Sequence, residues 1–243
     1  MFWRIVNAER MKLKSNWVLF SVVMAPLFVL LIQFANFMFR YQSVVRKGDI
    51  PWVKFIEQHA VIWAVMILPI LAAVLSSILI GVENTDNNWK YILSLPFKRG
   101  YIYLAKLSII FYLLVVSSIL LGLGMIVSAS LLDLPGQVPI IFLIKTLLGA
   151  LIGVFAILNI QFWLSTKFEN PGIPLAIAIC GTVTALFLLQ STFTRWLPWV
   201  YPYLTLPIKL NEGINIIWYV CQSVILGFLC FGAGLRQFVN KDV

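Results

Sequence analysis

Six apolar runs, each of about 20 residues or more, constrain this chain more than any other feature of its sequence. A helix of that length crosses about 30 Å of hydrocarbon, and inside a bilayer only helices or closed barrels satisfy all their backbone hydrogen bonds. We therefore predict an all-α membrane protein with six transmembrane helices, forming one domain over residues 1–243. The predicted spans are approximately Trp17 to Phe39, Ala60 to Val82, Leu104 to Ser130, Ile140 to Leu164, Gly172 to Thr192 and Ile214 to Leu235.

The composition agrees with this prediction and excludes other classes of protein. Of the 243 residues, 61% are hydrophobic and only 11% are charged, whereas soluble domains are about half apolar. The formal charge of +9 is spread over the segments that border the predicted spans, so a nucleic-acid partner is not expected. The anionic headgroups of the lipid bilayer are the expected partners of these basic residues.

The distribution of Lys and Arg predicts the orientation, because basic residues near span ends resist translocation. If both termini lie in the cytosol, most of the basic residues fall on cytosolic segments. We therefore expect a multi-pass protein with both termini cytosolic.

Residues 1–15 alternate apolar and basic side chains at helical spacing, which predicts an amphipathic helix in the membrane interface. Glu9 interrupts this pattern, since it falls within the apolar arc, where an unpaired carboxylate is costly. Two interpretations remain open. In one, Glu9 lies at headgroup depth and pairs with Lys12 on the same helix. In the other, Glu9 points into the protein and forms an ion pair with Arg99 or Lys106.

Two connections on the outer side are rich in aromatic residues. Upstream of His59, the residues Pro51, Trp52 and Phe55 predict a short interfacial helix, and we expect His59 to be interfacial as well. Residues 195–213 form a second connection, whose prolines exclude one continuous helix and predict a broken hairpin that dips into the outer leaflet. Its aromatic residues are either headgroup anchors or part of an external gate, and they are Trp196, Trp199, Tyr201 and Tyr203.

The polar stretch of residues 84–100 separates the second and third predicted spans. Thr85 and Asp86 are its best-placed N-cap residues, and Pro96 ends the short helix that follows. The apolar stripe of this helix is narrow and follows the i, i+3 and i+4 spacing. The stripe consists of Trp89, Ile92 and Leu93, with Lys90 beside it. Because so short a helix is marginal in water, it needs a surface against its stripe, either lipid headgroups or a groove in another protein.

Inside the spans, the polar residues are mostly neutral, and we expect them to form interhelical hydrogen bonds, each worth about 1 kcal/mol. They are Gln33, Asn36, Ser76, Ser77, Ser117, Ser118, Asn159, Gln161 and Gln222. Gly149 and Gly153 form a small-xxx-small pair that permits close helix contact and is a weak signal for a dimer.

No arrangement of residues predicts catalysis or a bound cofactor. The sequence has no G-x-x-x-x-G-K-[ST] phosphate loop, so any ATP must be bound by another polypeptide. A single histidine leaves no catalytic dyad and no set of metal ligands, which argues against an intramembrane protease or lipid transferase. The acidic residues Glu83, Asp133 and Glu212 lie at span ends, so coupling to a proton or sodium gradient is not expected.

Two stretches give the chain its resemblance to a known family. They are Ala-Glu-Arg-Met-Lys-Leu-Lys at residues 8–14, and Val-Glu at 82–83 continued by Trp-Lys-Tyr-Ile-Leu-Ser-Leu-Pro at 89–96, Arg99 and Tyr-Leu-Ala-Lys at 103–106. With these stretches, the chain resembles the permease subunits of type-2 ABC exporters over essentially its whole length. Among them it is most similar to the lantibiotic (bacteriocin) immunity permeases.

The resemblance implies a permease of the bacterial cell membrane that expels an antimicrobial peptide for self-immunity or resistance. It also implies a cytosolic coupling helix at residues 86–96, bound in a cleft of a separate ABC ATPase subunit that carries ATP and Mg. A second copy of the chain, or a homologous permease, would complete the transporter. The residues expected to contact the ATPase are Asp86, Trp89, Lys90, Ile92, Leu93 and Pro96. The alternatives are export of a drug, a lipid or sodium, and a membrane scaffold or sensor without transport.

Overall fold

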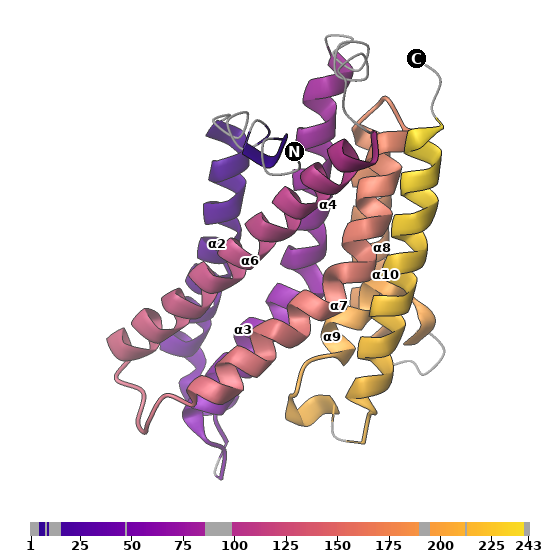
Figure 1. Ribbon diagram of the computed structural model, residues 1–243. Helices are drawn as coiled ribbons and strands as arrows, with labels where there is room; N and C mark the ends of the chain where they lie inside the picture. Colours follow the sequence, from indigo (N-terminus) through magenta and orange to yellow (C-terminus); the bar gives the residue numbers. More distant parts are fainter. Residues whose placement is uncertain are drawn as a thin grey trace.

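The computed structural model describes residues 5–7, 9, 16–46, 48–85, 99–189, 195–211 and 213–240. Every regular element within these ranges is helical, so the all-α prediction is confirmed for them (Figure 1). The elements are α2 (Asn16–Val44), α3 (Pro51–Ile62), η1 (Trp63–Ile67), α4 (Leu68–Thr85), α6 (Arg99–Leu131), α7 (Ile140–Lys167), α8 (Gly172–Leu188), η3 (Pro198–Val200), α9 (Tyr201–Leu204), η4 (Lys209–Asn211) and α10 (Ile216–Val239).

Within the described residues, five helical runs are long and apolar enough to cross a membrane. They are Trp17–Val44, Pro51–Glu83, Arg99–Leu131, Ile140–Lys167 and Ile216–Val239. The sixth predicted span corresponds to α8, which has 17 residues and therefore rises by roughly 25 Å, short of a typical hydrocarbon core. The count of six spans thus stays a prediction.

The second span begins earlier than the sequence predicts. Its first part, α3, is not a separate helix in the interface but continues through the π-helical turn η1 into α4. Trp52, Phe55 and His59 are all buried among the helices of the bundle. The His59 ring packs against Phe55, with ring centroids 4.2 Å apart, and its Nδ1–H donates to the Phe55 carbonyl at 2.8 Å.

Both ends of the bundle can be followed in Figure 1. At one end, here called the terminal end, α2 begins, α4 ends, α6 begins and α10 ends. At the opposite end, here called the loop end, α3 begins, α6 ends and α7 begins. Since α4 ends at Thr85 and α6 starts at Arg99, the outermost residues of the predicted 84–100 segment belong to these helices, and residues 86–98 lie outside the described residues.

α7 is the most central helix and packs against α4, α6, α9 and α10. The contact with α10 is fastened by Ser223, whose hydroxyl lies 2.8 Å from the Ile152 carbonyl oxygen. A second hydroxyl, that of Ser117 on α6, donates to the Val22 carbonyl of α2 at 2.7 Å. Such hydrogen bonds stabilise helix contacts where no hydrophobic effect drives helices together, each by about 1 kcal/mol.

Candidate functional site

A buried cluster of three charged side chains lies at the terminal end. Lys106 Nζ is 2.7 Å from Glu9 Oε2 and 2.9 Å from Glu83 Oε1. The three side chains are only 1%, 6% and 2% exposed, in the order Lys106, Glu9 and Glu83. At this depth the ammonium and the carboxylates depend on one another, because a single charge left in an apolar interior carries a large desolvation penalty.

The charge cluster joins three parts of the chain. Glu9 comes from the N-terminal helical stretch, of which residues 5–7 and 9 are described. Ile5, four residues before Glu9, is buried as well. Glu83 lies near the end of α4, and Lys106 lies in the first turns of α6. Glu83 and Lys106 therefore stand on the two sides of residues 86–98 and tie the flanks of that stretch together. The six residues predicted to contact an ATPase lie outside the described residues.

The structure places Glu9 in the protein interior rather than at headgroup depth, with Lys106 as its partner. Arg99, the other basic residue considered for Glu9, donates from Nη1 to the Val239 carbonyl at 3.0 Å. That oxygen belongs to the last turn of α10, where carbonyls lack partners within the helix and attract cations. The first turns of α6 therefore contribute Lys106 to the charge cluster and Arg99 to a hydrogen bond with the end of α10.

Glu83 was overlooked by sequence reasoning, which treated it only as a residue at a span end. A signal was present, because Lys106 falls inside the predicted third span and a lysine at that depth needs a counter-ion. Glu83 directly follows the predicted second span, at the same side of the membrane as the start of the predicted third span that holds Lys106. A search for acidic residues at the adjoining end of the neighbouring span would have found it.

At the loop end, residues 195–211 fold into a broken sequence of short helices, as their prolines predict. The segment packs into the bundle, with buried side chains at Val200, Tyr201, Leu204, Leu206 and Ile208. Of the four aromatic residues predicted as anchor or gate, only Trp196 is largely exposed, at 72%. Tyr201 is buried, and Trp199 and Tyr203 are half-buried.

Close contact between this segment and α7 depends on two glycines. A Cβ atom on Gly149 would lie 2.5 Å from the Thr205 carbonyl oxygen, and one on Gly153 would overlap Pro202. The Thr205 hydroxyl donates to the Gly149 carbonyl at 2.8 Å. The small-xxx-small pair therefore serves a contact within the chain, where the backbone of one segment approaches the backbone of another.

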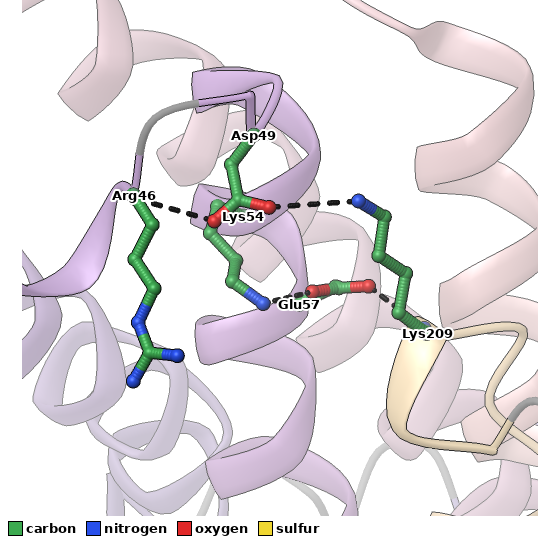
Figure 2. A network of polar contacts seen from close by, with 5 residues as sticks. All are labelled: Arg46, Asp49, Lys54, Glu57 and Lys209. Carbon is green, nitrogen blue, oxygen red and sulfur yellow. Dashed lines mark hydrogen bonds and ion pairs between the residues drawn. The ribbon is translucent and has the colours of Figure 1, made fainter.

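A network of charged residues connects the start of α3 with the end of the 195–211 segment (Figure 2). Glu57 accepts hydrogen bonds from Lys54 Nζ at 3.1 Å and from the Lys209 backbone amide at 2.9 Å. Asp49 accepts from the Arg46 amide at 3.2 Å and lies 3.5 Å from Lys209 Nζ. The Arg46 amide, and with it the charges of Lys54 and Lys209, lowers the pKa of Asp49 below its ordinary value.

Of the nine neutral polar residues named from the sequence, Ser117 and Gln33 form contacts between helices, and the Gln33 amide donates to the Gln58 carbonyl at 3.0 Å. Ser223, which forms another such contact, was not among them. Others bond within their own helix, such as Ser76 to the Ala72 carbonyl. The Gln161 amide is buried and makes no hydrogen bond to the described residues. Only some of the buried polar side chains therefore form hydrogen bonds between helices.

These features define a multi-pass helical membrane protein in which buried charges, rather than a reactive centre, tie the helix ends. The sequence model of the family described as ABC-2 family transporter protein matches residues 5–185. The match covers well over half of the chain, and the protein belongs to this family. It is therefore a permease of the type-2 ABC class, a class of membrane transport components. No curated protein matches the chain.

Proposed function

We propose that this chain is the membrane subunit of an ATP-driven exporter that expels an antimicrobial peptide, or a similar amphipathic molecule, from the membrane. Its terminal end lies in the cytosol, and residues 86–98 bind a separate ABC ATPase. The observation that carries the proposal is the charge cluster, because Lys106 joins the two helices that flank residues 86–98 to each other and to the N-terminal helical stretch.

The cluster explains how motion of a small segment reaches the membrane. Trp89, Ile92 and Leu93 form the surface that binds the ATPase, and closure of the ATPase pulls on residues 86–98. The ion pair between Lys106 Nζ and Glu83 Oε1, at 2.9 Å, links α6 to α4. The pull therefore displaces both helices rather than bending one of them. Glu9 adds the N-terminal stretch to the same moving unit.

Two observations support a substrate taken from the membrane. One is the resemblance to immunity permeases in residues 8–14 and 82–106, and the other is that the described span interiors carry mostly neutral polar side chains away from their ends. Neutral amides and hydroxyls suit a substrate that is itself partly apolar, whereas ionisable residues inside spans would mark a path for protons or ions. A peptide that partitions into the bilayer is therefore the preferred substrate class.

The ATPase contact is tested by substituting Trp89→Ala in the tagged chain, expressed together with a candidate ABC ATPase subunit from the same genome. Truncating an aromatic anchor in a groove commonly costs 2 kcal/mol or more, so we expect co-purified ATPase to fall by about 30-fold. Trp218→Ala, a control at an exposed tryptophan at the start of α10, leaves the yield of ATPase unchanged. Undiminished ATPase with Trp89→Ala contradicts the assignment of the coupling segment.

The substrate class is tested in cells that express the ATPase with this chain, the ATPase without it, or the ATPase with the Trp89→Ala variant. We expect only the first strain to survive raised concentrations of a lantibiotic. Resistance to a cationic dye or to sodium instead of the lantibiotic would assign the exporter to drug or ion transport. Equal sensitivity of all three strains to every compound would favour a scaffold or sensor.

A further inference from the structure

Glu57 is a buried acidic residue at the loop end that contacts two different parts of the chain. Only 2% of the residue is exposed. One carboxylate oxygen accepts from Lys54 on its own helix, at 3.1 Å, and the other accepts from the backbone amide of Lys209, at 2.9 Å (Figure 2). The second contact joins α3 to a segment 152 residues further along the chain.

The Lys209 amide needs this partner because it opens the short helix η4. The first amides of a helix have no acceptor within it, and a buried amide left unpaired is costly. A charged acceptor forms a stronger hydrogen bond than a neutral one, so the carboxylate fixes the position of the amide firmly. Burial, and then the negative charge of Glu57, also raises the pKa of Tyr203 above its ordinary value.

The space around these groups is too small for a ligand. A pocket of about 20 Å³ lies between the charged side chains, lined by Asp49, Ile50, Val53, Lys54, Glu57 and Lys209. That volume admits one water molecule. The arrangement therefore acts on the protein itself rather than on a bound molecule.

Six residues after Glu57 in the sequence, the regular α-helix of the second span is interrupted. Residues Trp63–Ile67 form a π-helical turn, in which the Leu68 amide donates to the Trp63 carbonyl. Pro69 follows directly and has no amide to donate. Both features interrupt the regular hydrogen-bond ladder, and such interruptions are where helices bend. The break separates α3, which holds Glu57, from α4, which ends at the charge cluster.

We propose that Glu57 fixes residues 195–211 to α3 so that the two move as one body relative to α4. The joint is the π-helical turn with Pro69. This inference rests on the proposed function, because it takes the motion of α4 to originate at residues 86–98. It assigns to the second span the task of carrying that motion to the loop end.

The first test measures hydrogen exchange of the peptide covering residues 203–211 in the full-length chain in lipid nanodiscs, without ATPase. Glu57→Leu removes the acceptor, and Lys209→Pro removes the donor while keeping a backbone that suits the first residue of a helix. We expect each to speed exchange of this peptide by about tenfold or more. Lys209→Ala retains the amide and serves as the matched control, together with Asp49→Asn, and both stay within about twofold of the wild type.

The outcomes separate the inference from its alternatives. Unchanged exchange with Lys209→Pro, or equal acceleration with Lys209→Ala, overturns the role of the Glu57–amide contact. If Glu57→Leu fails to fold, the Lys209 pair decides alone. Because no ATPase is present, failure of the Trp89→Ala experiment would leave this result intact, and the reverse also holds.

The second test locates the joint by spin-label distances in the same nanodiscs. One label pair joins Ile50 with Trp196, and the other joins Val82 with Trp196, all three being exposed positions. We expect Pro69→Ala, which restores a helical amide, to narrow the Val82–Trp196 distribution and leave the Ile50–Trp196 distribution unchanged. Narrowing of both distributions alike, or of neither, would show that α3 and α4 do not move as separate bodies.

Discussion

Two groups of charged residues hold the bundle at its opposite ends, and they do so differently. At the terminal end, Lys106 binds two carboxylates within 3 Å, and all three side chains are almost completely buried. At the loop end, Lys209 is 55% exposed and lies 3.5 Å from Asp49, while the buried Glu57 holds a backbone amide. One group joins charge to charge, and the other joins a charge to the main chain.

This difference predicts how strongly substitutions at each end reduce the stability of the protein. Lys106 is the critical member of the cluster, because removing it leaves two carboxylates in an apolar interior without their shared ammonium, whereas removing one carboxylate leaves an ion pair. Exposed ion pairs contribute little, since water screens them, so the loop end depends on its buried amide contact and on packing against α7. We expect substitutions at the terminal end to be severe and those at the loop end to be graded.

The largest effect is expected for Lys106→Met. The substitution keeps the approximate length of the side chain but removes the ammonium that contacts both Glu9 and Glu83. Loss of one partner of a buried ion pair costs about 3–5 kcal/mol, and we expect a loss of this size in the free energy of unfolding. The measurement is denaturant unfolding of the purified chain in detergent. Lys167→Met, at an exposed lysine ending α7, is the control and changes little.

A charge exchange between Glu9 and Lys106 tests the geometry of the cluster. Glu9→Lys places two ammonium groups together, and adding Lys106→Glu restores an attractive pair, with a coupling free energy of about 2–3 kcal/mol. The rescue is partial because the new carboxylate at position 106 faces Glu83. Adding Glu83→Gln should therefore improve the rescue. A double variant no more stable than the sum of its parts would argue against a direct contact.

Packing at the loop end is tested by Gly153→Ala. The added methyl group overlaps Pro202, so residues 195–211 must shift, and overpacking of this kind costs about 1–2 kcal/mol. The helical Gly232 has no atom near the position of a Cβ, and Gly232→Ala serves as its control, changing stability by less than about 1 kcal/mol. Thermal unfolding of both variants gives the comparison. Equal stability of the two would mean that the segment does not depend on the glycine contact.

The smallest effect concerns Asp49 and acid pH. Its pKa is lowered from the ordinary 3.8 in the folded protein, so its contribution is complete above pH 3.8 and is lost as the pH falls through the folded value. The stability difference between the wild type and Asp49→Asn should therefore be constant from pH 7 to about pH 5 and disappear near pH 2. A difference that vanished already near neutral pH would assign the effect to another group.

The membrane class, the helical fold and most span positions follow from the sequence, because a bilayer leaves an apolar run of this length few alternatives. The start of the second span could not be predicted in this way. Hydropathy treats Lys54 and Glu57 as polar residues that end a span, whereas the structure pairs them inside the bundle. The partner of Glu57 is an amide on a distant segment, and no local pattern reveals it.

The charge cluster could likewise be predicted only in part, because its contacts join segments that are distant in the sequence. Glu9 stood out as a carboxylate on an apolar helix face, and Lys106 was one of two considered partners. Nothing local distinguished Lys106 from Arg99, since the choice depends on how α6 meets α10 and the N-terminal stretch. The Gly149 and Gly153 pair was equally ambiguous, because small residues at this spacing permit close approach of any backbone.

The use of that glycine pair limits how the protein can assemble. Pro202 and Thr205 of the same chain already cover the small-residue face of α7 near the loop end. A second copy could reach that face only after residues 195–211 had left it. Self-association through the Gly149 and Gly153 face of α7 would thus be incompatible with the folded loop end.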